Sequence, residues 1–425
     1  MELREKRRIA AFVAALAILA AGAAGAVSLH RFQPGFAAVL CFSAVIAASL
    51  LISWGAEAAQ FMVSQGLAVA LIALLQVVPE LMVEAVIAWE AGRTGRVALV
   101  FANATGSNRL LTGFGWPLIL FIADFFHRRK HGRPLEALRL RPEHVLEVLA
   151  LLLGGLWYLV IIFTGRLTLV DSVVLGGAFV AYLWALNRLP AENAEEVDEL
   201  MAPPRLLANL TRWRRPVTVV ALFLLGGAVM YAVAEPFLSA MTEVAVAIGV
   251  SQFAFVQWVA PFLTEFPEKV TAIYWSRTVK LAPMALLNMV SSTVNQFTAL
   301  VAMIPIAYSV SAGHVASIPM DALHRTEVFL SFATVLYGAV CLFKLRFTRG
   351  NALVMGTLFL IQFVYEGQID LPTFREGGFR LTGIEAHLVV AWTYVAFSVA
   401  ELARHAKEIR IGQALGQSFA AMRRR

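Results

Sequence analysis

Glu80 and Glu268 each follow a proline inside a long apolar stretch. A carboxylate buried in a membrane costs at least ~2.5–3.5 kcal/mol, so an acid in such a stretch is a candidate functional residue. The prolines, Pro79 and Pro267, each remove a backbone donor and free a carbonyl one turn earlier. Hard cations such as Ca²⁺ bind carboxylate and carbonyl oxygens, and two carboxylates offset a divalent charge. These positions therefore predict a cation-binding site within the membrane, although a structural ion pair with Lys or Arg is the alternative for each acid.

Further polar residues accompany the two glutamates. Asn103 and Asn288 stand in neighbouring apolar windows, where they serve either as amide ligands of the site or as interhelical hydrogen-bonding residues. Glu84 lies four residues after Glu80 and hence on the same helix face. It is either a second acid or a residue at the mouth of the site.

Glu265 and Lys269 are also four residues apart. This spacing favours a neutralising ion pair over two independent functional groups.

An internal repeat relates the two halves of the chain. In each half a Val-Ser-Gln triplet precedes an apolar run, a Pro-Glu pair and an Asn-led stretch of small polar residues. The triplets are Val63-Ser-Gln65 and Val250-Ser-Gln252, and the stretches are Asn103–Asn108 and Asn288–Asn295. An odd number of helices per half makes the second repeat enter the membrane in the opposite sense, as in secondary transporters whose site lies between inverted repeats.

The composition supports a membrane protein. The chain has 425 residues, of which 59% are apolar and 15% charged, and its mean hydropathy is +0.73. Soluble domains are roughly 45–50% apolar and about 25% charged. The net charge of +7 is distributed in short runs between apolar segments, which indicates membrane topology rather than nucleic-acid binding. Only Cys41 and Cys341 are present, which gives no support to a disulfide framework.

Twelve windows are apolar enough to span a bilayer, which needs ~20 such residues. They fall near 9–29, 34–60, 65–91, 95–122, 143–164, 168–187, 217–247, 250–276, 280–308, 326–346, 351–366 and 384–404. The predicted fold is an all-α polytopic membrane protein. Its predicted segments are an N-terminal extra helix (1–33), a first half (34–187) with a repeat at about 63–110, a linker (188–216), a second half (217–366) with a repeat at about 250–297, and an extra helix with a basic tail (367–425).

Short loops rich in Lys and Arg favour the cytoplasmic side. The 127–142 loop and the 188–216 linker carry such clusters, as do both chain ends. We therefore expect both termini to be cytoplasmic and the protein to reside in the plasma (inner) membrane. Arg93 and Arg96 fall on the other side.

These motifs resemble the alpha-repeats of the cation/calcium exchanger superfamily, which includes the sodium/calcium exchangers. Val78-Pro-Glu-Leu81 and Ala102–Asn108 match the first repeat, and Thr264–Glu268 with Asn288 and Ser291-Ser-Thr293 match the second more loosely. The resemblance implies an inverted-repeat antiporter core of ten helices, with one extra helix at each end here. It also implies that Glu80 and Glu268 are the central cation-binding carboxylates, Asn103 and Asn288 their amide partners, and Thr264 a further ligand.

Some positions depart from the family pattern. Gln76 and Val77 replace hydroxyl residues before the first Pro-Glu, and Glu265 replaces a serine in the second repeat. Leu99 and Met284 are apolar where hydroxyl ligands can stand. These changes leave fewer oxygen atoms for sodium sites.

The resulting hypothesis is a secondary-active cation antiporter that exchanges Ca²⁺ or a related cation against Na⁺ or H⁺, without a cofactor. Carboxylates clustered at low dielectric repel one another, so we expect one of them to hold a proton at neutral pH, which favours H⁺ as counter-ion. The alternative is a non-transporting membrane scaffold or sensor that retains the exchanger fold. An intramembrane enzyme is disfavoured because the helices carry no paired aspartates, Ser/Lys dyad or His-Glu-x-x-His motif.

Overall fold

The computed structural model describes residues 3–29, 34–59, 61–62, 77–188, 200–366, 383–409 and 411–423. The Val63-Ser-Gln65 motif, Gln76 and residues 189–199 of the linker lie outside the described residues. Within these ranges, nine helices are long and apolar enough to cross a membrane, so the chain is an integral membrane protein.

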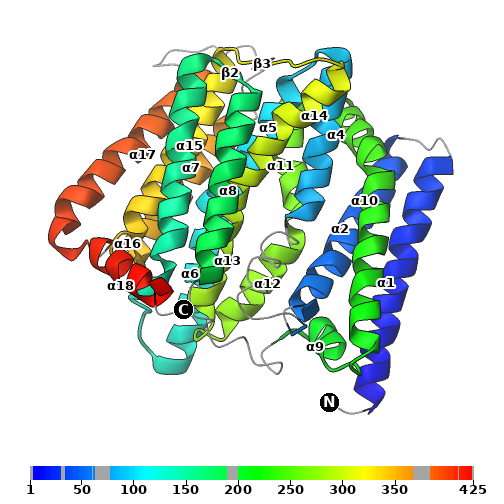
Figure 1. Cartoon of the computed structure of the whole chain (residues 1–425), viewed down its shortest axis with the longest axis horizontal. Coiled ribbons are helices and arrows are strands. Elements are labelled where there is room, and N and C mark those ends of the chain that lie inside the picture. The colour runs from blue at the N-terminus through cyan, green and yellow to red at the C-terminus, as the bar shows by residue number, and fades with distance from the viewer. Residues whose placement is uncertain are drawn as a thin grey trace.

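Apart from α11, the described helices of the two halves follow the same order along the chain (Figure 1). The first half contains α2 (Pro34–Ala59), α4 (Val78–Thr94), α5 (Ala98–Arg109), α6 (Trp116–His131), α7 (Val145–Thr164) and α8 (Leu169–Arg188). The second contains α10 (Arg214–Ala247), α11 (Gln252–Thr264), α12 (Phe266–Arg277), α13 (Ala282–Asn295), α14 (Val301–Ala312), α15 (Ala322–Leu342) and α16 (Arg349–Glu366). The short helix α9 (Ala202–Ala208) precedes α10.

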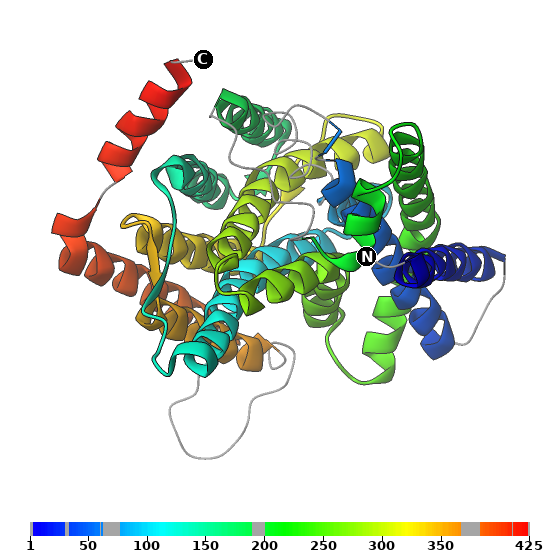
Figure 2. The same ribbon diagram turned by 90° about the horizontal axis from the view of Figure 1, so that it is seen from below.

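The extra helices flank opposite edges of this core. Helix α1 (Leu3–Leu29) packs on α2 and α10, whereas α17 (Gly383–His405) packs on α15 and α16. Figures 1 and 2 both show α1 on one side of the molecule and α17 with α18 (Ile411–Arg423) on the other. The expected core with one spanning helix added at each end is confirmed, whereas the sequence did not predict the short helices α9 and α18.

Several helix ends differ from the apolar windows because polar residues extend the helices. Helix α6 continues to His131 through Arg128, Arg129 and Lys130. Their positive charges interact favourably with the negative C-terminal end of the helix dipole. Gly132 then adopts a φ of 68°, which ends the helix. Helix α15 starts at Ala322 because Asp321 caps it, accepting a hydrogen bond from the His324 N–H at 2.9 Å.

Two short sheets show that the halves run in opposite senses. Strand β1 (Ala137–Arg139) precedes α7 and pairs with β4 (Arg346–Thr348), which follows α15. Strand β2 (Arg166–Leu167) follows α7 and pairs with β3 (Ile318–Pro319), which precedes α15. Helix α7 therefore ends where α15 begins, and the two packed helices are antiparallel.

A π-helical segment interrupts the corresponding long helix of each half. Segment η1 (Leu110–Gly115) joins α5 to α6, and η4 (Gln296–Leu300) joins α13 to α14. Such π segments occur often at functional sites, because the extra residue per turn reorients the side chains around it.

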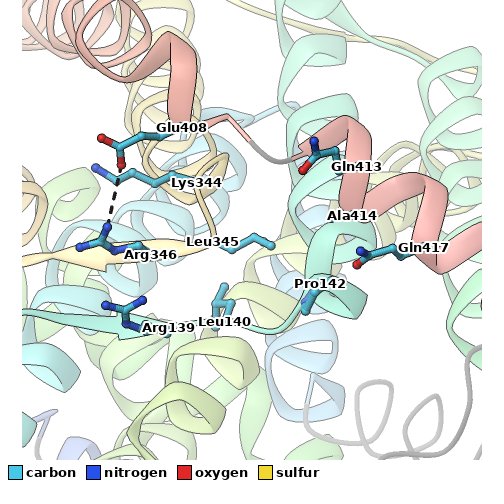
Figure 3. A pocket seen from close by; sticks show the side chains of 10 residues that line it. All are labelled: Arg139, Leu140, Pro142, Lys344, Leu345, Arg346, Glu408, Gln413, Ala414 and Gln417. Carbon is cyan, nitrogen blue, oxygen red and sulfur yellow. Dashed lines mark ion pairs between the residues drawn. The ribbon is translucent and has the colours of Figure 1, made fainter.

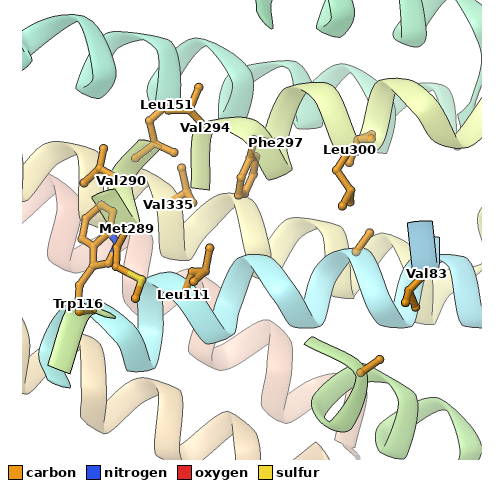
Figure 4. Packing of buried hydrophobic residues seen from close by; sticks show 14 of the residues in the cluster. Val83, Leu111, Trp116, Leu151, Met289, Val290, Val294, Phe297, Leu300 and Val335 are labelled. Atoms are coloured by element: carbon orange, nitrogen blue, oxygen red, sulfur yellow. The ribbon is translucent and has the colours of Figure 1, made fainter. Parts of the chain in front are cut away.

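Apolar side chains from both halves pack around these π segments, as Figure 4 shows for Leu111, Leu151, Val294, Phe297 and Val335. In a membrane the lipid tails are as apolar as these side chains, so the close packing of the helices provides the stabilisation. Helices α5 and α11 approach so closely at Gly106 that an added Cβ would lie 1.9 Å from the Gln257 carbonyl oxygen. Gly106 therefore permits this close packing of α5 against α11.

Candidate cation-binding site

Glu265 lies at the break between α11 and α12, where it is the C-cap of α11 and the N-cap of α12. Its N–H donates to the Pro261 carbonyl at 3.0 Å and ends α11, while its own carbonyl accepts from the Lys269 N–H at 3.2 Å and begins α12. Pro267 lies in the first turn of α12, where no donor is required. The carboxylates of Glu265 and Glu268 are therefore placed at an interruption inside a buried helix pair.

Glu80 occupies the matching position in the first half. It lies in the first turn of α4, after Pro79, and is 4% exposed. Acidic side chains are favoured at a helix N-terminus because the helix dipole is positive there. Glu80 and Glu268 thus both begin helices, and both carboxylates interact electrostatically with Glu265.

Gln296 joins the acids of the two halves. Its amide Nε2 donates to both carboxylate oxygens of Glu80 at 3.0 Å and to Oε1 of Glu265 at 2.7 Å. Gln296 is the first residue of η4 and is 1% exposed, and its Oε1 has no hydrogen-bond partner. Gln296 was not predicted from the sequence, although its position directly after the Asn-led polar stretch within an apolar window was a usable signal.

Glu84 and Asn103 form a second polar contact. The Asn103 amide donates to Glu84 Oε2 at 2.5 Å, and the two side chains are 1% and 0% exposed. Asn103 thus contacts Glu84 rather than Glu80, because Glu84 lies one helical turn farther along α4, where α5 packs against it. Glu84 is a fully buried acid and does not lie at an exposed mouth.

Of the remaining predicted ligands, Glu268 and Asn288 each retain a polar atom without a hydrogen-bond partner, whereas the Thr264 hydroxyl is engaged. Glu268 is 6% exposed and its Oε2 has no hydrogen-bond partner, and the buried Nδ2 of Asn288 has none either. The Thr264 hydroxyl donates to the Ala260 carbonyl at 3.1 Å within its own helix. In the described part of the chain, neither Asn288 nor Thr264 is hydrogen-bonded to a carboxylate of the site.

Lys269 supplies a positive charge to the site. Its Nζ lies 2.5 Å from Glu265 Oε2, and both side chains are almost fully buried. The ion pair expected from the i,i+4 spacing is confirmed. The ammonium group of Lys269 and the amide group of Gln296 thus engage carboxylate oxygens that could otherwise coordinate a cation. Among the described residues, no three His, Cys, Asp or Glu side chains are already arranged around a common metal position.

A second buried network lies beside the site and was not predicted. Arg109 of α5 forms an ion pair with Glu327 of α15, and both side chains are 0% exposed. Glu327 also contacts Nδ1 of His387, on α17, at 2.6 Å and accepts from Gln257 Nε2, on α11, at 2.7 Å. The same Gln257 nitrogen donates to the Thr105 hydroxyl at 3.1 Å. This network joins both halves of the chain to the extra C-terminal helix.

Two antiparallel halves, a broken helix in the second and buried carboxylates from both define a secondary-active cation antiporter. The chain belongs to the sodium/calcium exchanger protein family, whose sequence model matches residues 32–187 and 218–366. The resemblance of the two motif sets to this superfamily is therefore confirmed. Members of this family are transporters.

Solved exchangers share the fold. The crystal structure of the H⁺/Ca²⁺ exchanger CAX is 29% identical in sequence, with a TM-score of 0.87 over 99% of this chain and 100% of that chain. The sodium-calcium exchanger NCX_Mj, soaked with Na⁺ and Sr²⁺, is 16% identical, with a TM-score of 0.51 over 82% of this chain and 98% of that chain. The latter likeness concerns the fold alone. Among curated protein sequences, none matches this chain.

Proposed function

We propose that this antiporter exchanges Ca²⁺ or a related divalent cation for protons by alternating access. Glu80, Glu265 and Glu268 are the proposed central carboxylates. The further proposed ligands are Glu84, Asn103, Asn288 and Thr264.

The observation that carries this proposal is the placement of the Gln296 amide nitrogen between the carboxylates of Glu80 and Glu265. An N–H donor and a cation compete for the same carboxylate lone pairs. A cation that replaces this donor would contact an acid from each half of the chain. Rocking of one half against the other would then expose the cation to alternate sides of the membrane.

Protons fit the site better than Na⁺ as the counter-ion. Buried carboxylates that repel one another can each accept a proton, whereas Na⁺ requires additional oxygen ligands. Val77, Leu99 and Met284 provide no side-chain oxygen at three positions where hydroxyl ligands were sought. The similarity of the whole chain to a protein described as an H⁺/Ca²⁺ exchanger supports the same choice.

Uptake of Ca²⁺ into proteoliposomes tests the proposal. A pH gradient imposed without sodium should drive uptake, and Glu80→Gln and Glu268→Gln should abolish it while the purified variants remain folded. Glu90→Gln, an exposed residue of the same α4, is the matched control and should transport normally. Uptake that requires a sodium gradient and ignores pH would show that protons are the wrong counter-ion.

The non-transporting scaffold remains the second candidate, and the Lys269–Glu265 ion pair favours it. If the Lys269 ammonium group stays bound to the Glu265 carboxylate, it blocks a position that a transported cation needs. In that case neither gradient would drive flux in the wild-type protein, whereas Lys269→Gln, which removes the internal cation, would restore it.

We also propose that both termini face the cytoplasm, in the plasma (inner) membrane. The N-terminus, α9 and the connection from α6 to α7 lie at the same end of the molecule in Figure 1, and this end carries the Lys- and Arg-rich loops. Arg133→Cys and Arg214→Cys should resist an impermeant thiol reagent in intact cells, whereas Arg96→Cys at the other end should react. Labelling of Arg133→Cys or Arg214→Cys from outside would show that the orientation is the reverse of the proposed one.

A further inference from the structure

Two arginines face each other in the β1–β4 sheet. Arg139 and Arg346 are direct partners in this antiparallel pair, so their side chains leave the same face of the sheet. Like charges directly opposite each other destabilise a strand pair. A negative charge near the two guanidinium groups would therefore relieve this repulsion.

The two arginines line a pocket of about 250 Å³. Figure 3 shows them beside Lys344, with Gln413 and Gln417 approaching from α18 on the other side. Glu408 and four apolar residues complete the lining. The pocket thus combines three cationic side chains with two amides.

The acids near the pocket do not neutralise the two arginines. Lys344 is engaged by Glu401 of α17. Glu408 lies 3.9 Å from Arg346 Nη1, and the two side chains are 54% and 36% exposed, so solvent weakens this contact. The buried Nε of Arg346 has no hydrogen-bond partner. Arg139 is exposed, and no acidic side chain in the described part of the chain forms an ion pair with it.

Helix α18 places this pocket at a membrane surface. Its residues Ile411, Ala414, Leu415 and Ser418 recur at helical spacing and face the protein, whereas Gly412, Gln413, Gly416 and Gln417 are exposed. Figure 1 shows α18 lying across the ends of the spanning helices instead of parallel to them. Because α18 packs on α7 at the ends of the spanning helices, the pocket beside it lies at the level where the hydrocarbon core gives way to the lipid headgroups.

We propose that this pocket binds a phosphate group, held between the guanidinium groups of Arg139 and Arg346. The planar guanidinium matches phosphate oxygens with paired N–H donors. Gln413 and Gln417 of α18 line the same pocket beyond Leu345 and Pro142 (Figure 3). The phosphate comes either from the headgroup of an anionic phospholipid, which basic pockets between helix ends at a membrane surface bind, or from a free anion.

Thermal unfolding of the full chain in nanodiscs separates the two sources. One arm compares discs of phosphatidylcholine with discs that also contain phosphatidylglycerol, and a second arm adds inorganic phosphate to the phosphatidylcholine discs. Arg139→Gln removes one guanidinium of the pocket. Arg133→Gln is the matched control, because Arg133 is an exposed arginine of the same connecting segment that does not line the pocket.

We expect phosphatidylglycerol to stabilise the wild type and Arg133→Gln equally, and its half-saturating fraction to rise at least about tenfold in Arg139→Gln. Stabilisation by inorganic phosphate alone, also lost in Arg139→Gln, would support the same pocket with a free anion. Gln413→Glu, on the exposed side of α18, places a negative charge at the pocket and should weaken binding without altering the sheet. Equal responses of the wild type, Arg139→Gln and Gln413→Glu to both anions would overturn the proposal.

Discussion

The amide nitrogen of Gln296 lies 3.0 Å from each carboxylate oxygen of Glu80, across the boundary between the two halves of the chain. The same nitrogen reaches Glu265 at 2.7 Å. One side chain at the start of a π segment thus sets the spacing of two buried acids. Its own oxygen has no partner, so rotation of the amide would offer this oxygen to a cation.

The first prediction concerns this amide. Gln296→Leu should lower the apparent affinity for Ca²⁺ in uptake assays at least about tenfold, because the variant loses the amide oxygen that rotation would offer to the cation. Thr298→Val in the same π segment is the control, since the Thr298 hydroxyl bonds only to the Val294 carbonyl of its own helix. An unchanged affinity in Gln296→Leu would remove Gln296 from the site.

The second prediction concerns the internal ion pair. Lys269→Gln and Glu265→Gln should each lower the free energy of unfolding in detergent by about 3–5 kcal/mol, because each leaves a buried charge without its partner. The double variant should lose less than the sum of the single losses, which a double-mutant cycle measures directly. Strict additivity of the two losses would mean that the ion pair contributes no coupling. Lys130→Gln, an exposed residue of α6, should be neutral.

Close packing of the two halves leads to the third prediction. Gly106→Ala places a Cβ against the Gln257 carbonyl and should cost about 1–3 kcal/mol of stability, since overpacking forces the backbones apart. Gly177→Ala on α8, where no heavy atom lies within 4 Å of the added Cβ, should be neutral or slightly stabilising. Thermal unfolding of the two variants compares them, and equal melting temperatures would contradict the close contact.

The network around Glu327 is the basis of the fourth prediction. Glu327→Gln should destabilise the protein by about 3–5 kcal/mol, because it removes one partner of a fully buried ion pair. Glu90→Gln breaks an exposed pair with Arg93, whose ions are 3.8 Å apart, and should give no measurable change. A denaturant titration in detergent measures both. If Glu327→Gln unfolds at the same denaturant midpoint as the wild type, the buried ion pair is energetically neutral.

The sequence alone predicted the membrane class, the repeated order of helices and the intramembrane acids. These features were accessible because a carboxylate is costly in an apolar window wherever the helix points, and Glu80 and Glu268 are therefore visible without coordinates. The Glu265–Lys269 pair was predictable for a similar reason, since its spacing of four residues brings the two side chains together within one helix.

Only the tertiary structure decided which side chains meet between helices. Asn103 contacts Glu84 instead of Glu80, and Gln296 instead of Asn288 bridges the acids. Such choices depend on how each helix is rotated about its axis and how the π segments shift the register of the side chains. The contact of Arg109 with Glu327, and the pairing of Arg139 with Arg346, join residues more than two hundred positions apart, and no local periodicity carries that information. Packing of the two halves against each other therefore determined the partners of the acids, whereas the apolar windows determined only their presence.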